Sequence, residues 1–174
     1  MYAYEKTVLQ TYHQTEAFIK STILAIKRGA RSSYYSKRPT LELAEEIINL
    51  KLQLEEIQEM KNAIDESLLE INPCYSRILK VRYELENSDN EHIKKDNTYY
   101  RKVAYALGKF VISMRKRGFT GEVFQQLFQN YGYLESAYRQ ISNFETKVKQ
   151  CGNLKSSGTS LKDKKVSKKG FKNF

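Results

Sequence analysis

The stretch from residue 40 to residue 72 constrains the fold most, because it lacks glycine and proline and keeps a heptad pattern throughout. Eight of the nine positions in its 4-3 repeat are apolar: Leu43, Ile47, Leu50, Leu54, Ile57, Lys61, Ile64, Leu68 and Ile71. This repeat predicts one long helix with a buried seam, which packs either on the chain's own helices or on a second copy. In a homodimer through helix 40–72, Lys61 would tune register or oligomeric state.

The remainder of the chain also reads as helix. Residues 2–28 predict a first amphipathic helix that ends near Gly29, followed by a basic loop to Pro39. Asn72 and Pro73 form a cap and a first helical position, so a helix should continue through CYSRILKVRYEL. Its apolar face is expected to hold Ile78, Leu79 and Tyr83 or Leu85.

The last third of the chain predicts further helices. One predicted helix has an apolar stripe formed by Val103, Leu107, Phe110 and Met114. Asn97 or Thr98 is expected to cap its start. Apolar residues from Phe124 to Val148 predict one or two more, broken at Gly132. We therefore expect an all-α helix bundle with a disordered basic tail, because residues 151–174 have almost no apolar mass to offset the entropy of ordering.

Charge is distributed unevenly along the chain. Residues 40–72 carry nine carboxylates against two lysines, whereas residues 73–119 carry eleven basic side chains against five acidic ones. We divide the chain into an N-terminal helix and basic loop (1–39), a long acidic helix with a DNA-binding unit (40–118), C-terminal helices (119–150) and the tail (151–174). A charged partner responds to the local electrostatic potential, so this division indicates that separate segments of the chain bind partners of opposite charge.

Several function classes are not indicated by the sequence. Cys74 and Cys151 lie far apart without metal-ligand spacing, and His13 and His92 are isolated, so we expect no metal, no cofactor and no enzyme activity. The N-terminus lacks the features of a secretory signal, and no run of 18 uncharged apolar residues occurs. These features predict a cytoplasmic protein that does not insert into membranes.

Residues 64–110 carry a resemblance to a known family. A helix, a proline, the segment YSRILKVRY, a polar link and the segment TYYRKVAYALGKF follow one another. This order resembles region four of bacterial sigma factors and, more narrowly, the ArpU-type transcriptional regulators of phages. The positions that match the recognition helix best are Thr98, Tyr100, Arg101, Ala106, Leu107, Lys109 and Phe110. The resemblance implies a degenerate helix-turn-helix, with HIKKDN in its link, that binds double-stranded DNA, with RNA polymerase as a further partner.

The residues themselves support the same site. A helix 98–114 that buries its apolar stripe should present these residues partly outward, near a helix N-terminus that favours phosphate: Thr98, Tyr99, Arg101, Lys102, Tyr105 and Lys109. Nonspecific phosphate contacts are expected from Arg115, Lys116, Arg117, Lys164, Lys165, Lys168 and Lys169. The cluster 115–117 has an alternative explanation, since cations also favour a helix C-terminus.

Three hypotheses follow for the function. The first is a DNA-binding transcriptional regulator that reads duplex DNA with helix 98–114. The second is a non-enzymatic coiled-coil adaptor or phage assembly protein that uses the acidic helix 40–72. The third is a general RNA- or single-strand-binding protein, although Tyr131 and Tyr138 are expected to be packing residues rather than a stacking platform.

Overall fold

The computed structural model describes residues 2–32, 39–85 and 97–156, and these residues form seven α-helices and no strand. The helices are α1 (Ala3–Gln10), α2 (Tyr12–Ser32), α3 (Thr40–Glu70), α4 (Pro73–Arg82), α5 (Asn97–Lys116), α6 (Gly121–Asn130) and α7 (Gly132–Ser156). The predicted all-α class is confirmed. Among the described residues, every helix is too short or too polar to cross a lipid bilayer.

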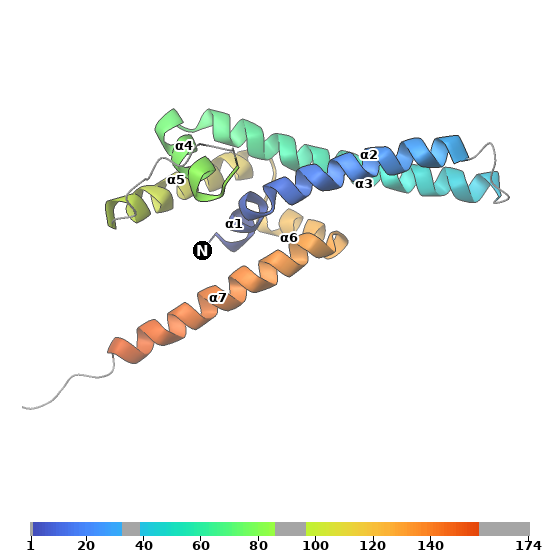
Figure 1. Ribbon diagram of the computed structural model, residues 1–174. Coiled ribbons are helices and arrows are strands. Elements are labelled where there is room, and N and C mark those ends of the chain that lie inside the picture. Colours follow the sequence, from blue (N-terminus) through green and yellow to red (C-terminus); the bar gives the residue numbers. More distant parts are fainter. Residues whose placement is uncertain (1, 33–38, 86–96, 157–174) are drawn as a thin grey trace, which may run out of the picture.

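Helices α2 and α3 lie side by side and form an arm that extends from the rest of the molecule (Figure 1). All nine heptad positions of α3 are buried or partly buried, so the seam packs within the chain. Lys61 pairs there with Asp65 at 2.7 Å and also donates to the Tyr12 hydroxyl at 3.1 Å. Burial lowers the pKa of Lys61, but these hydrogen bonds outweigh it and leave the pKa raised.

The predicted single helix 2–28 is wrong in two respects, since it is two helices that divide at Thr11 and the second continues to Ser32. Thr7, Thr11 and Thr15 each donate their hydroxyl to the carbonyl four residues earlier, at 2.7 to 3.1 Å, a pattern that bends helices. Gly29 does not end α2, and a side chain at this position would come within 3.4 Å of Ile47 of α3.

Helix α1 sits at the centre of the core. Val8 and Leu9 are fully buried, in one cluster with residues of α3, α4, α5, α6 and α7. Tyr4 stacks on Tyr138 of α7 with ring centroids 4.6 Å apart, and its ring also meets Phe124 and Phe128 of α6. Segments 1–39, 40–118 and 119–150 therefore contribute to one shared core.

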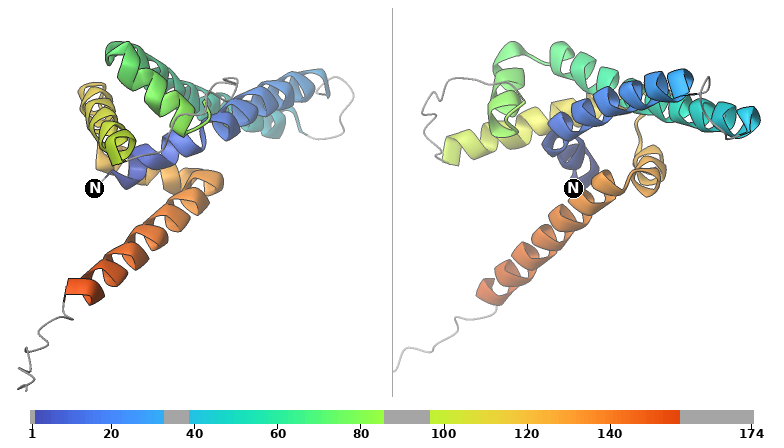
Figure 2. Two further views of the ribbon diagram at one scale, coloured as in Figure 1. Left: turned by 60° about the vertical axis from the view of Figure 1, so that its left-hand side comes forward. Right: turned by 45° about the vertical axis from the view of Figure 1, so that its right-hand side comes forward.

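The C-terminal helices match the prediction of a break at Gly132, where α7 begins. The predicted tail boundary at residue 151 is too early, because α7 continues to Ser156. Figure 2 shows that the later turns of α7 point away from the other helices. Residues 157–174, which include Lys164, Lys165, Lys168 and Lys169, lie outside the described residues.

Candidate nucleic-acid interface

Helix α5 has one buried face and one exposed, basic face. Leu107, Phe110 and Met114 are at most 3% exposed and Val103 is partly buried, which confirms the predicted stripe. The opposite face exposes the side chains of Thr98, Arg101, Lys102, Tyr105 and Lys109. Helix α5 contains five basic residues and no aspartate or glutamate. It therefore presents a positive surface that no carboxylate of its own neutralises.

The first half of this surface has cations that remain available to a ligand. Within residues 2–32, 39–85 and 97–156, Arg101 and Lys102 form no ion pair. Lys109 lies 5.3 Å from the centroid of the Tyr105 ring, an exposed cation–π contact. Arginine and lysine side chains in this state can bind base edges or phosphates without first breaking an internal contact.

Tyr99 contradicts the prediction that it points outward, because it is only 5% exposed. Its position explains the error: Tyr99 lies four positions before Val103 and therefore extends the apolar stripe by one turn. Its ring also meets the ring of Tyr100 edge-on at 5.5 Å. Tyr99 therefore supports the N-terminal end of α5 from inside, and it leaves the set of candidate DNA contacts.

The basic cluster at the end of α5 is divided between solvent and the acidic helix α3. Arg115 is exposed, whereas Arg117 binds Glu66 at 3.0 Å and Glu70 at 2.6 Å. Lys116 also reaches Glu70, at 3.1 Å. These bonds hold the end of α5 against the end of α3. Arg117 and Lys116 therefore have internal partners on α3, whereas the phosphate contact predicted for Arg115 stays a prediction.

Glu70 receives most of these contacts. Hydrogen bonds from Ser113, Arg117 and Lys116 lower its pKa from 4.5 to about 2. The carboxylate is therefore ionised at any pH near neutrality. Its charge is matched locally by two cations, so it subtracts little from the positive surface further along α5.

A pocket of about 340 Å³ opens between the start of α4 and the second half of α5. Tyr75 of α4 and Tyr105 of α5 meet in it, with ring centroids 5.0 Å apart. Lys109 and Lys116 also line it. Tyr75 was missed by sequence reasoning, because only the packing of α4 on α5 brings it to the basic face.

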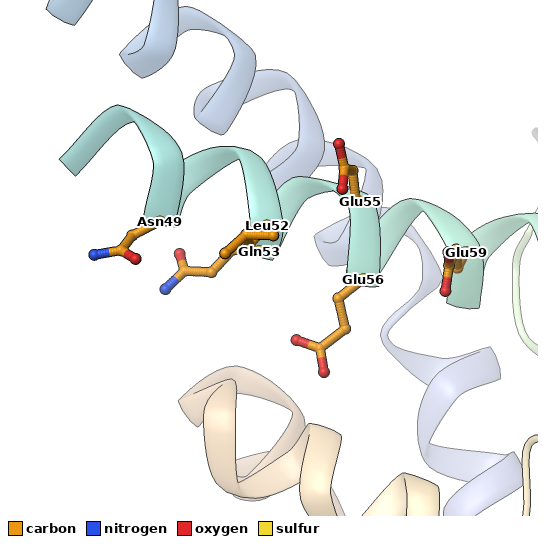
Figure 3. A pocket seen from close by; sticks show the side chains of 6 residues that line it. All are labelled: Asn49, Leu52, Gln53, Glu55, Glu56 and Glu59. Atoms are coloured by element: carbon orange, nitrogen blue, oxygen red, sulfur yellow. The ribbon is translucent and has the colours of Figure 1, made fainter. Parts of the chain in front are cut away.

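A second surface hollow lies on the acidic helix α3. Its volume is about 540 Å³. Figure 3 shows the residues that line it on successive turns of α3: Asn49, Leu52, Gln53, Glu55, Glu56 and Glu59. Glu56 points toward the α6–α7 corner and accepts a hydrogen bond of 2.7 Å from the Tyr131 hydroxyl. Tyr131 is 4% exposed, as expected of a packing residue, and burial raises its pKa. Tyr138 is partly buried against the aromatic core.

Two predicted features lie outside the described residues. One is the polar link at residues 86–96, which holds HIKKDN except for its last residue, Asn97, and the other is the set of four tail lysines. Among the described residues, no group of three histidine, cysteine or acidic side chains is arranged to hold a metal ion. Comparisons with family models, curated proteins and solved structures found no match to this chain.

Proposed function

We propose that this protein is a DNA-binding transcriptional regulator that reads duplex DNA with α5. The observation that carries the proposal is the exposed face of α5, where Arg101 and Lys102 form no ion pair with any described residue and where the helix has no acidic residue. The buried stripe on the other face fixes the orientation of this helix against the core. A rigid helix with a basic outer face is the element that the major groove admits.

The residues divide by the chemistry that they offer. Arg101 can donate two hydrogen bonds to a guanine edge, and Lys102 lies beside it. Thr98, Tyr105 and Lys109 are suited to phosphate oxygens, which position a protein without reading sequence. The basic residues of 157–174 would add salt-dependent attraction to any duplex. The sigma-factor and ArpU-type resemblance of residues 64–110 supports the same assignment.

The proposal is tested by selecting bound sequences from a random duplex library with the full chain. We expect enrichment of a defined sequence and binding that survives an excess of random duplex. A truncated chain that ends at Ser156 should bind every duplex more weakly, with a flatter salt slope and unchanged sequence preference. Binding without enrichment, lost entirely on salt addition, would contradict sequence-specific regulation and leave only charge attraction.

A coiled-coil adaptor remains the second candidate, because α3 exposes apolar residues beside its buried seam. Leu41 is 71% exposed, Ile48 is 56% exposed and Leu52 is 58% exposed. Their spacing of seven and four residues puts them on one face of the helix. For this function, replacing Ile48 with glutamate should abolish capture of a helical protein partner. The regulator predicts that duplex binding by the same variant is unchanged.

A further inference from the structure

The pocket between α4 and α5 combines an apolar floor with a positive, hydroxyl-bearing rim. Ile71 and Ile112 contribute aliphatic surface, and the rings of Tyr75 and Tyr105 extend it. At the rim are the ammonium groups of Lys109 and Lys116. Its volume of about 340 Å³ is that of a small-ligand site.

The tyrosine hydroxyls at the rim are available to a ligand. The hydroxyls of Tyr75 and Tyr105 make no hydrogen bond with any residue in 2–32, 39–85 or 97–156. Asn72 also lines the pocket at the start of α4, so the positive end of that helix dipole faces it. The Asn72 side chain already accepts from the backbone amide of Cys74 at 2.9 Å. Lys116 already donates to Glu70 at 3.1 Å, so the two tyrosine hydroxyls and the Lys109 ammonium are the donors that remain in the described part of the chain.

One anionic residue, Glu70, also lines the pocket, and its effect is contained. Its carboxylate is bound by Ser113, by Lys116 and by Arg117. Arg117 shares its charge between Glu66 and Glu70, and Lys116 pairs with Glu70, so Lys109 is the cation that is left to act on the pocket. The local electrostatic field therefore favours an anionic group, and the apolar floor favours a ligand that also has an uncharged, apolar part.

The geometry points to a seat for one sugar–phosphate unit of a DNA strand, with the phosphate at Lys109 and the tyrosine hydroxyls and the deoxyribose over Ile112. A sugar–phosphate unit joins an apolar ring to a single charge, which matches the two halves of the pocket. This assignment rests on the proposed function, because the strand would be the one that flanks α5 in the groove. It adds Tyr75 and Ile112 to the interface. Through Tyr75, α4 would then help to fix the register of α5 on the duplex.

Ile112 offers a sharp test, because it is 53% exposed and tolerates a change of charge without disturbing the core. Replacing Ile112 with glutamate should weaken binding of selected and random duplexes alike, about tenfold, because it removes the apolar contact with the sugar and places a negative charge next to the phosphate. Ile48→Glu is the matched control, since Ile48 is equally exposed on α3 and the change in net charge is the same. It should leave duplex binding unchanged.

Removal of one hydroxyl gives a second, independent readout. Tyr75→Phe keeps the ring and should weaken all duplexes about threefold, the loss of a single hydrogen bond. Ring signals of Tyr75 and Tyr105 in NMR spectra should shift when duplex is added to the wild-type protein. They should shift only at far higher concentrations of inorganic phosphate, because free phosphate lacks the sugar contact.

The outcomes separate this assignment from the proposed function. If the wild type binds a selected duplex and the Ile112 and Tyr75 variants bind it equally well, the strand does not occupy this pocket. Shifts that saturate with inorganic phosphate, together with unchanged duplex binding by Tyr75→Phe, would identify a free-anion site and overturn the strand assignment. A wild-type protein that binds no duplex overturns the proposed function itself.

Discussion

Helices α3 and α5 each have a buried apolar seam and carry opposite charge, and they use their polar residues differently. Acidic α3 directs many of its charges inward to neighbouring elements: Lys61 and Asp65 to Tyr12, Glu56 to Tyr131, and Glu66 and Glu70 to Arg117. Basic α5 leaves Arg101, Lys102 and Arg115 exposed. Apolar seams decide where both helices lie, whereas the unmatched charges indicate which one meets a charged partner.

Breaking the buried seam of α5 should have the largest effect. Leu107 is 3% exposed, so Leu107→Ala should lower the free energy of unfolding by about 2–5 kcal/mol through lost contacts and a residual cavity. Ile112→Ala on the exposed side of the same helix should change it by less than about 0.5 kcal/mol. Chemical denaturation measures both. Equal effects would mean that the assignment of the two faces is wrong.

The hydrogen bond between Glu56 of α3 and Tyr131 tests whether the charges of α3 stabilise the packing of its neighbours. The Tyr131 hydroxyl shares its one proton between the Glu56 carboxylate, at 2.7 Å, and the Gln53 carbonyl, at 3.1 Å, so Tyr131→Phe should destabilise the protein by about 1–2 kcal/mol. Tyr105→Phe is the control, because the exposed Tyr105 hydroxyl has no hydrogen-bond partner in the described part of the chain. If both variants have the same denaturation midpoint as the wild type, the contact between α3 and the α6–α7 corner contributes nothing to stability.

The smallest expected effect concerns the contact that joins α3 to α5. Hydrogen bonds to Ser113, Arg117 and Lys116 lower the pKa of Glu70 from 4.5 to about 2, so its contribution is present above pH 4.5. It is lost progressively as the pH falls toward 2. Glu70→Gln should therefore flatten the stability profile between these two values. An identical acid profile for wild type and variant would show that the contact does not favour the folded state.

Local patterns predicted much of this fold. The 4-3 repeat of α3, the stripe through Leu107 and the Asn72–Pro73 start of α4 all depend on neighbours close in sequence, and all are confirmed. The break at Thr11 was missed, because apolar spacing alone does not register hydroxyls that bond back to the preceding turn.

The candidate interface was harder to predict, because it depends on which helix ends meet. Arg117 and Glu70 are far apart in sequence, and nothing local indicates that they form an ion pair. The pairing of Tyr75 with Tyr105 likewise requires α4 to pack on α5. Tyr99 shows the opposite case, since extending the stripe back by four residues would have placed it inside.

The most direct test of the proposed function replaces Arg101 and Lys102 with alanine and measures binding to a selected duplex and to random duplex. The double variant should keep its helicity and melting temperature, because both side chains are exposed, and should lose its preference for the selected sequence. Lys27→Ala with Arg28→Ala is the matched control, an exposed pair of the same charge on α2. Full sequence preference in the α5 variant would contradict the account and favour the coiled-coil adaptor.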